Sequence, residues 1–456
     1  MRKPRISILQ WILCGIMVAG FALTTSAQKL DMDKFKNMKA RAIGPAGMSG
    51  RFTAFDVVLS NTDVIYLGTA SGGLWKSVNA GTTWEPIFDE QPVASIGALA
   101  IVQSNPDVIY VGTGEGNPRN SQTNGNGMYK TLDGGKTWTH LGLEATRNIH
   151  RVIVHPENPD VVFVGAQGTA WADTPDRGVY KSIDGGKTWK KILYNNERTG
   201  IGELVMDPEN PNKLFAAMWE WFFKSGGPGS GLYVTFDGGE TWTQRTAEDG
   251  LPKGELGRMG LAIARSNPNI VYALIEAKKN GFYRSEDGGF KWKLVTDSDR
   301  NMGNRPFYYF EIYVDPANEN RIYSLHSRVT YSEDGGKTFE QLMTGGPVHP
   351  DHHAFWIHPQ DPSFIIDGND GGANISYDRG ETWRFIENLP LAQFYHINVD
   401  METPYNVLGG MQDNGSWRGP STVWRSGGIR NSYWEEVAFG DGFDVVPDES
   451  DPRYGY

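Results

Sequence analysis

The sequence predicts an all-β fold assembled from repeated four-stranded units. One octapeptide of the general form Ser/Thr-x-Asp-Gly-Gly-x-Thr-Trp recurs seven times, with successive copies starting 44 to 54 residues apart, about the length of one blade of a β-propeller. Glycine contributes 56 of the 456 residues and tryptophan 15, which suits short strands joined by tight turns. We therefore expect a seven-bladed β-propeller over residues 39–390. The copies are Ser77–Trp84, Thr131–Trp138, Ser182–Trp189, Thr235–Trp242, Ser285–Trp292, Ser332–Phe339 and Ser376–Trp383.

Each unit reads as four consecutive strands, A to D. A turn such as Glu157-Asn158-Pro159-Asp160 joins strand A to strand B, because proline and asparagine favour tight turns. A loop of variable length joins B to C, and the octapeptide joins C to D. In the third unit the strands are expected at Arg151–His155, Val161–Gly165, Gly178–Lys181 and Trp189–Leu193.

The octapeptide has a structural explanation. Its aspartate can accept backbone N–H groups across its own turn, and its glycines allow positive φ angles. Its terminal tryptophan begins strand D and can pack between sheets. Asn79 in the first copy and Arg379 in the last are tolerable variations. The residues expected to be structural in this way are Asn79, Asp133, Asp184, Asp237, Asp287, Asp334 and Asp378.

The N-terminus has the features of a secretory signal. Basic residues precede the apolar run Ile8–Leu23, and small residues ending at Ala27 offer a cleavage site. Residues 1–27 are thus interpreted as a signal peptide and residues 28–38 as a linker. Cys14, the single cysteine, lies in the signal, so the mature chain would hold no disulfide. We expect an exported protein that is periplasmic, cell-surface or secreted; an uncleaved anchor is the alternative.

After Trp383 the strand pattern restarts without an octapeptide. Phe394–Asp400 reads as a strand A and Tyr405–Gly409 as a strand B. We expect residues 391–456 to be the truncated start of a second propeller. The alternative is a C-terminal tail packed on the first propeller.

Charge and motifs restrict the partners. The chain carries 43 basic and 54 acidic residues, a net charge of −11, which disfavours nucleic acid and anionic membrane surfaces. No metal or cofactor motif is present, so we expect no cofactor, and a monomer. The remaining partners are a polysaccharide or a peptide or protein ligand.

Candidate ligand-binding residues lie on one face. The B–C loops and D–A connections share the face opposite the octapeptides, and variable loops on a rigid scaffold often carry function. The densest titratable cluster, His349 to His353, belongs to the same unit as Asp370; it reads as an acid–base site or as a hydrogen-bonded anchor. Flat aromatic rings suit sugars, unless they are buried between blades. The candidates are Arg51, Glu115, Arg119, Arg147, His150, Trp171, Trp219, Trp221, Arg258, Tyr308, His349, Asp351, His352 and His353.

The octapeptides resemble the Asp boxes (BNR repeats) of sialidases, sortilin-type receptors, xyloglucanase-like glycoside hydrolases and photosystem II assembly-factor-like proteins. The segments Arg41–Arg51, Gly68–Ser77 and Gly112–Ser121 resemble more closely a group of large exported bacterial proteins described as sortilin-like or glycosyl-hydrolase-like. Members of that group carry two propellers in tandem. The resemblance implies handling of extracellular polysaccharide on the loop face.

Glycoside hydrolysis usually requires two carboxyl groups. The xyloglucanase-like pattern places one acid in an Arg-Thr-Asp-x-Gly-Gly stretch, where this chain has Ala70. The resemblance implies that Asp413 in Gly410–Gly415 corresponds to the second acid, and Asp370 has a similar setting. Asp370 and Asp413 are therefore the candidate catalytic residues. The Arg-Ile-Pro motif of sialidases is missing, and a non-catalytic sortilin-like binding propeller or an envelope assembly scaffold is the alternative.

Overall fold

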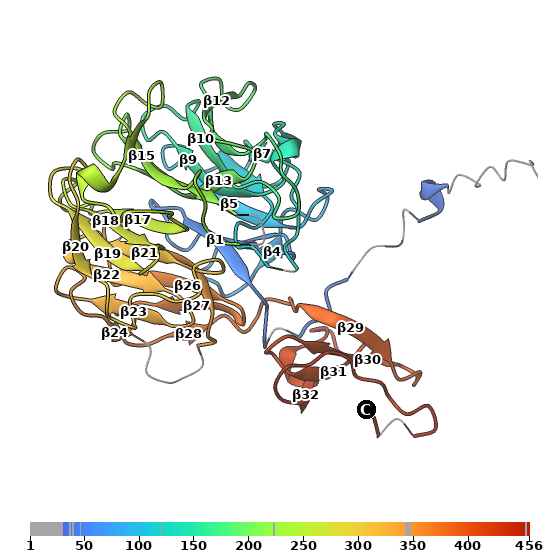
Figure 1. Ribbon diagram of the computed structural model, residues 1–456. Coiled ribbons are helices and arrows are strands. Elements are labelled where there is room, and N and C mark those ends of the chain that lie inside the picture. The colour runs from blue at the N-terminus through green and yellow to red at the C-terminus, as the bar shows by residue number, and fades with distance from the viewer. Residues whose placement is uncertain are drawn as a thin grey trace, which may run out of the picture. The chain divides into compact units, whose positions relative to one another are not determined.

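The computed structural model describes residues 31–35, 38, 41–45, 47–119, 121–221, 224–342, 348–451 and 454–456. The predicted signal peptide lies outside these residues. The chain divides into two units, residues 1–42 and 43–456. The second unit is all-β with almost no helix, and it holds eight four-stranded antiparallel sheets, each with its strands in sequence order (Figure 1).

The four strands of each sheet repeat in one order along the chain. The first strands are β1 (Phe52–Val57), β5 (Ile96–Ile101), β9 (Ile149–Val154), β13 (Thr199–Met206), β17 (Met259–Ile263), β21 (Glu311–Asp315), β25 (His352–Ile357) and β29 (Phe394–Val399). The second strands are β2 (Ile65–Thr69), β6 (Ile109–Thr113), β10 (Val162–Ala166), β14 (Leu214–Glu220), β18 (Val271–Ile275), β22 (Asn318–Leu325), β26 (Ile365–Asn369) and β30 (Asn406–Met411). The third strands are β3 (Leu74–Ser77), β7 (Met128–Thr131), β11 (Gly178–Ser182), β15 (Gly231–Thr235), β19 (Gly281–Ser285), β23 (Val329–Ser332), β27 (Gly372–Ser376) and β31 (Ser416–Pro420). The fourth strands are β4 (Glu85–Pro86), β8 (Thr139–His140), β12 (Lys190–Leu193), β16 (Thr243–Arg245), β20 (Lys293–Thr296), β24 (Glu340–Gln341), β28 (Arg384–Phe385) and β32 (Glu435–Ala438). Short 3₁₀ turns are η1 (Met32–Phe35), η2 (Glu144–Thr146), η3 (Ala247–Asp249) and η4 (Asn431–Tyr433).

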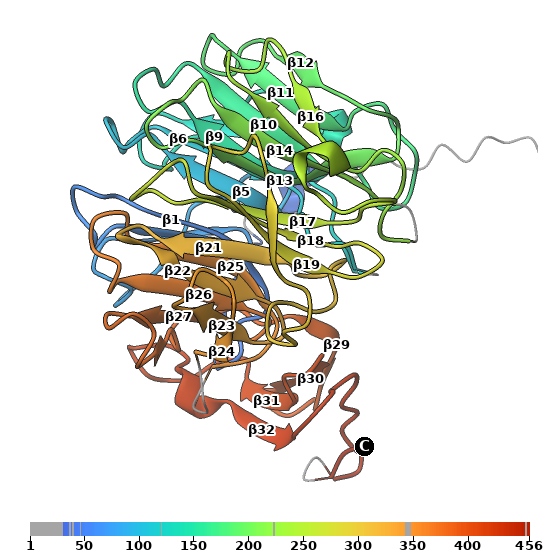
Figure 2. The ribbon, with the colours of Figure 1, turned by 60° about the vertical axis from the view of Figure 1, so that its left-hand side comes forward.

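The first strands of seven sheets contact one another in cyclic order. β1 lies beside β5, the series continues through β9, β13, β17 and β21 to β25, and β25 lies beside β1 (Figure 2). A hydrophobic cluster joins the first and seventh sheets through Ile65 and Leu67 on one side and Ile366 and Ile375 on the other. Apolar burial between neighbouring sheets therefore holds the ring together.

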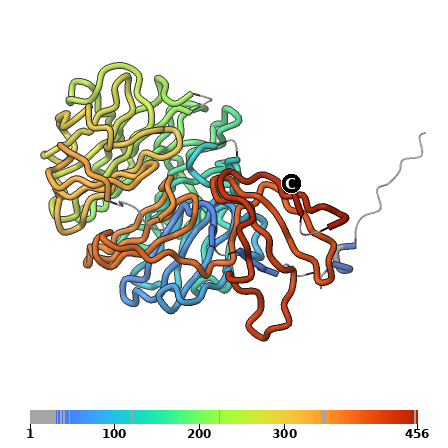
Figure 3. Tube along the Cα trace, turned by 90° about the horizontal axis from the view of Figure 1, so that it is seen from below, coloured from blue at the N-terminus to red at the C-terminus, as the bar shows by residue number. Residues whose placement is uncertain are grey.

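The eighth sheet, β29–β32, lies outside this ring (Figures 1 and 3). Its first strand is largely exposed, unlike β1 or β5, which are almost wholly buried. Residues just before β1 contact both the eighth sheet's segment and the ring of seven sheets. The Trp434 indole N–H donates to the Ile43 carbonyl at 2.8 Å, and Ser49 N–H donates to the Gly371 carbonyl at 2.9 Å.

The octapeptides form the turns between third and fourth strands, as predicted. In the second copy, Asp133 accepts from the Thr137 backbone N–H at 2.9 Å and from the Thr137 hydroxyl at 2.6 Å. The Trp138 indole donates to the Ile87 carbonyl of the preceding sheet at 2.7 Å. In the last copy Arg379 takes a φ of 62°, close to the 68° of Gly134 in the second. The motif thus shapes its own turn and links adjacent sheets.

Candidate functional site

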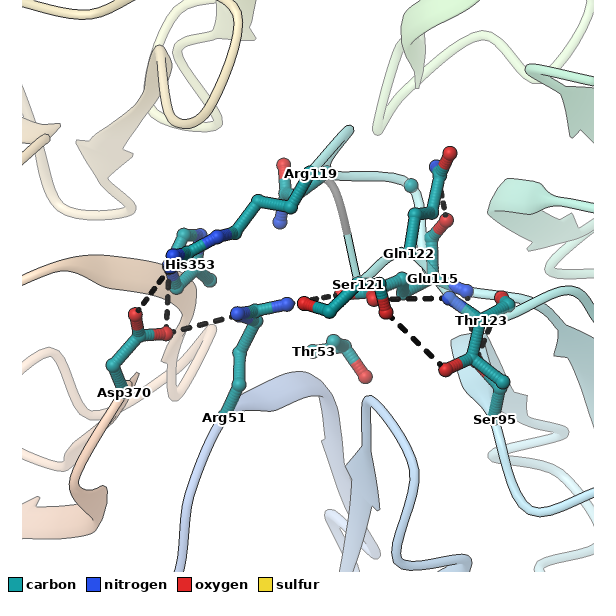
Figure 4. Close-up of polar contacts among 12 residues, drawn as sticks. Arg51, Thr53, Ser95, Glu115, Arg119, Ser121, Gln122, Thr123, His353 and Asp370 are labelled. Carbon is teal, nitrogen blue, oxygen red and sulfur yellow. Dashed lines mark hydrogen bonds and ion pairs between the residues drawn. The ribbon is translucent and has the colours of Figure 1, made fainter. Parts of the chain in front are cut away.

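Asp370 lies in the loop between β26 and β27, at the centre of a buried polar cluster (Figure 4). Arg51, immediately before β1, donates from Nε to Asp370 Oδ1 at 2.9 Å. The Tyr308 hydroxyl donates to Asp370 Oδ2 at 2.6 Å. Arg119 Nη1 lies 3.5 Å from the same oxygen, and His353 Nε2 lies 3.1 Å from Oδ1. Loops from different sheets therefore converge on one carboxylate.

The loop between β6 and β7 crosses toward several other sheets. Its Glu115 accepts from Arg51 Nη1 at 2.6 Å, and both side chains are buried. Its Arg119 donates to the Tyr308 hydroxyl at 2.7 Å, and its Asn117 accepts from Arg258 at 3.0 Å. The β6–β7 loop is a B–C loop, and its partners Arg51, Arg258 and Tyr308 lie on D–A connections. The two kinds of loop therefore lie on one face, as predicted from the strand order.

The cluster holds Asp370 in its ionised form. Burial alone would raise the pKa of the Asp370 carboxyl group, but the positive charge of Arg51 and the contact with His353 lower that pKa far below its usual range. Burial raises the pKa of the Tyr308 hydroxyl well above its usual range. Asp370 is thus a fixed negative charge at neutral pH and is unsuited to donate a proton.

A second charged network lies deeper, where the first strands meet. Arg151 Nη2 lies 3.1 Å from Glu311 Oε1 and also bonds Glu203, and Arg258 Nη2 lies 3.4 Å from Glu311 Oε1. Burial, followed by the charges of Arg151 and Arg258, lowers the pKa of His150 well below its usual value. A cavity of about 150 Å³ adjoins this network. His150 and Arg258 are therefore parts of a buried network and not of an open surface.

The eighth sheet completes a small pocket next to Asp370. Gln412 follows β30 and accepts from Arg119 Nη2 at 2.8 Å and from the Tyr395 hydroxyl at 2.7 Å. Asn414 Nδ2 donates to the Asp370 carbonyl at 3.3 Å. The pocket encloses about 20 Å³ and is lined by Arg51, Asp370, Gln393, Tyr395, Gln412 and Asn414.

Asp413 stands beside this pocket in a different environment. It is exposed, with a φ of 56°, and its backbone N–H donates to Asp441 Oδ1 at 3.1 Å. Partial burial and the neighbouring charge of Asp441 raise the pKa of the Asp413 carboxyl group. His349 Nε2 lies 3.5 Å from the Asp413 carbonyl oxygen. Asp413 is thus the better suited of the two candidate acids to carry a proton.

Other predicted residues are distributed between surface and interior. Trp171 is 45% exposed and Trp219 only 1%, with the Arg258 guanidinium 5.3 Å above its ring. Trp221 stacks on Phe307. The burial of Trp219 agrees with the alternative of rings packed inside the fold, and it removes that ring from any ligand surface.

The histidine cluster also separates. His352 is buried and bonds Asp367 through Nδ1 at 2.8 Å, whereas His353 faces Asp370. His349 and Asp351 are partly exposed, and Arg147 is exposed with a φ of 60°. The side chain of His353 therefore contacts the Asp370 carboxylate, and the Asp351 carbonyl accepts the Asp370 backbone N–H at 3.0 Å. Ala70, which stands where the xyloglucanase-like pattern has an acid, donates its N–H to the Arg51 carbonyl at 3.0 Å, so its position adjoins the same arginine.

Several site residues were missed by the sequence analysis. Gln412 and Asn414 flank Asp413 in the Gly410–Gly415 stretch. Their position beside a candidate acid could have identified them as site residues. Gln393 and Tyr395 lie at the start of a predicted strand, and Asp441 lies within residues 391–456, which were expected to begin a second propeller. Nothing in the local pattern marked Arg151, Glu203 or Glu311.

The described residues contain neither a membrane-spanning helix nor a cluster of metal ligands. None of the helices within these residues has the length and apolar character to cross a bilayer. Over the same residues, no group of three or more His, Cys, Asp or Glu side chains is arranged to hold a metal ion.

Comparisons with known proteins agree with this architecture. Residues 280–390 match the model of the family described as sortilin, neurotensin receptor 3, and residues 233–244 match the BNR/Asp-box repeat. A xyloglucanase of Paenibacillus sp is 25% identical over 325 residues, covering 62% of this chain and 30% of the relative. The photosystem II assembly protein Ycf48 of Thermosynechococcus vestitus is 28% identical over 159 residues, covering 27% of this chain and 42% of the relative.

A solved structure supports the fold. The xyloglucanase of Xanthomonas campestris superposes with a TM-score of 0.59 at 17% identity, covering 82% of this chain and 60% of that enzyme. The structure neighbours are β-propellers, so the fold is an Asp-box β-propeller that resembles the xyloglucanase-like proteins. The chain spans 30% of the length of the Paenibacillus relative.

Proposed function

We propose that this chain is an exported glycoside-hydrolase-like propeller that acts on extracellular polysaccharide at the face of the B–C and D–A loops. In this proposal the ring of seven sheets is a closed seven-bladed propeller, and residues 391–456 begin a second one. The pocket between Asp370 and the eighth sheet carries the proposal, because it joins the Asp370 carboxylate to neutral polar side chains and has Asp413 beside it. The similarity to xyloglucanases supports the substrate class.

The two environments suggest different roles for the two candidate acids. Asp413, whose pKa is raised, would protonate the glycosidic oxygen as the bond breaks. Asp370 keeps its negative charge in the pocket wall and holds Arg51 and Tyr308 in position. Asp441, next to Asp413, is a further ionisable carboxylate that could activate water.

The experiment is release of reducing ends from xyloglucan and other β-glucans by the full-length protein. Asp413→Asn should abolish release, and Asp370→Asn and Asp441→Asn should each reduce it strongly. Asp63→Asn, an exposed aspartate in the β1–β2 turn, is the matched control and should leave release unchanged. A folded protein that releases nothing from any glucan would contradict the proposal.

The second candidate is a peptide- or protein-binding propeller. The match of residues 280–390 to the sortilin family and the likeness to an assembly protein favour it. Under this candidate the same loop face would bind an extended peptide, and Asp413→Asn would leave binding intact. Screening a peptide library on the folded protein, with and without xyloglucan as competitor, distinguishes the two candidates.

A further inference from the structure

The second position of the octapeptide is exposed in every copy. Single exposed apolar side chains are common on protein surfaces and need no explanation. Here, however, five copies carry an apolar residue at this one position, and their sheets, the seventh and the first four, follow one another around the ring. We call these five side chains the apolar arc; they are Val78, Leu132, Ile183, Phe236 and Tyr377.

The turn itself does not require an apolar residue at this position. The copies in the fifth and sixth sheets carry Glu286 and Glu333 there. In the fifth copy Asp287 accepts from the first hydroxyl group of the octapeptide at 2.8 Å, and Asp184 of the third copy does so at the same distance. The same turn thus forms with a glutamate or an apolar residue, so turn formation does not explain the apolar arc.

Packing within the chain explains the arc no better. None of the hydrophobic clusters among the described residues includes Val78, Leu132 or Ile183, which are 60%, 68% and 71% exposed. Phe236 and Tyr377 each stack on one neighbouring ring and still remain 42% and 54% exposed. Removing this apolar surface from water would be favourable, so the arc suits an apolar environment supplied from outside.

The spacing of the arc favours a lipid surface over a protein partner. A stable protein interface buries a contiguous patch of about 800 Å² on each side, whereas the arc offers one side chain per sheet. A fluid lipid layer takes up separate apolar side chains independently, because it adapts its shape around each one. The octapeptide face also lies opposite the face that the eighth sheet contacts through Gln412 and Asn414.

Charge on this face indicates the kind of lipid. The second and third octapeptides each carry an exposed lysine four residues after their apolar side chain. These lysines are Lys136 and Lys187, and an ammonium group beside an inserted apolar side chain suits the phosphate of a lipid headgroup. The net charge of −11 opposes an anionic membrane. A zwitterionic phospholipid offers the phosphate without a net negative charge.

We infer that the octapeptide face docks on a zwitterionic phospholipid surface. Leu132 and Ile183, each with its lysine, form the centre of the contact, and the other members of the apolar arc flank them. The loop face then points away from the lipid and stays open to its own ligand. This inference is therefore independent of the proposed function.

The first test measures co-sedimentation of the full-length protein with phosphatidylcholine vesicles. The double variant Leu132→Glu/Ile183→Glu should lower the partition coefficient at least about tenfold, because two apolar side chains no longer leave water. It should fold, because two native octapeptides carry glutamate at this position, and its melting temperature checks this. Ser121→Glu/Asn124→Glu is the matched control; it adds the same charges at exposed positions of the β6–β7 loop, on the opposite face, and should leave partitioning unchanged.

The second test locates the contact. Cys14 is the only cysteine, so Cys14→Ser allows one new cysteine to be labelled with the environment-sensitive dye NBD. A label at Leu132→Cys should shift its emission to shorter wavelength when vesicles are added. A label at Glu333→Cys, the same octapeptide position on the acidic side of the ring, should not shift. This comparison holds whatever the N-terminal segment contributes to vesicle binding.

Each alternative outcome is distinct. Absence of vesicle binding, equal shifts from the two labels, or equal partitioning of the double variant and the wild type would overturn the inference. Binding only to vesicles that contain phosphatidylglycerol, abolished by 0.5 M salt, would assign the contact to electrostatics and overturn it as well. Self-association in solution that the double variant abolishes, without any lipid binding, would assign the arc to a second copy of the chain. None of these results depends on release of reducing ends from a glucan.

Discussion

Arg51 and Asp370 are 319 residues apart in the chain, and their side chains meet at 2.9 Å. Arg51 precedes the first strand of the first sheet, and Asp370 follows the second strand of the seventh. The ion pair thus spans the place where the first and seventh sheets adjoin, and the same arginine continues to Glu115 of the second sheet's loop. One side chain therefore serves both the contact between sheets and the candidate site.

Arg51→Met should destabilise the protein by about 3–5 kcal/mol, because it removes the cation paired with the buried Glu115 and leaves Asp370 with Arg119 and His353 alone. Arg51→Lys keeps the charge but cannot reach both carboxylates in the same geometry, so it should recover only part of the loss. Urea unfolding followed by tryptophan fluorescence measures both. A change below about 1 kcal/mol for Arg51→Met, the range of an exposed pair, would show that the network adds little to stability.

The octapeptide turns should make the fold sensitive to acid. Hydrogen bonds from the Thr188 side chain and backbone lower the pKa of Asp184 to about 2, against about 3.9 in an unfolded chain. The folded pKa is the lower one, so the stabilisation is complete above about pH 4 and is lost as pH falls toward 2. Melting temperature measured from pH 6 to pH 2.5 should fall steeply below pH 4.

The control for this pH effect comes from the chain itself. Asn79 forms the same turn in the first octapeptide, where its Oδ1 accepts from the Thr83 N–H at 2.8 Å. Asp184→Asn should therefore fold, and it should show a shallower fall of melting temperature below pH 4 than the wild type. If melting temperature falls equally steeply in both proteins, protonation of groups other than Asp184 causes the acid destabilisation.

The raised pKa of Asp413 predicts the pH dependence of any hydrolysis. A general acid must be protonated, so activity should fall as pH rises through the pKa of Asp413. Asp441→Asn removes a neighbouring negative charge that raises this pKa. The alkaline limb of the pH–rate profile should therefore move to lower pH in Asp441→Asn. An unchanged alkaline limb would assign that limb to another group.

Gly116 should tolerate no side chain. A Cβ atom at this position would lie 1.9 Å from Nδ1 of the buried His150. Gly116→Ala should cost about 1–3 kcal/mol through displacement of packed groups, measured by urea unfolding. At Gly427 a Cβ would meet only the mobile end of the Arg430 side chain at 2.9 Å, so Gly427→Ala should be nearly neutral. Equal effects of the two changes would contradict the rigid fit of the Gly116 loop.

The sequence by itself determined the local architecture. The third unit shows this: its strands were expected at Arg151–His155 and Gly178–Lys181, and the structure has them at Ile149–Val154 and Gly178–Ser182. The octapeptide could be read directly because its hydrogen bonds, such as those of Asp133 to Thr137, join residues four apart. Local spacing and residue type suffice for such turns.

Only the tertiary structure decided how the loops combine. The grouping of Arg51, Glu115 and Asp370, and their link through Arg119 to Gln412, depends on how the sheets pack around a common centre. Burial was equally inaccessible to the sequence, since Trp171 and Trp219 were both expected among the loop-face candidates, whereas Trp219 lies buried in β14 and Trp171 is exposed. The physical reason is that burial and pKa depend on neighbours that are distant in the chain, whereas turns depend on neighbours within it.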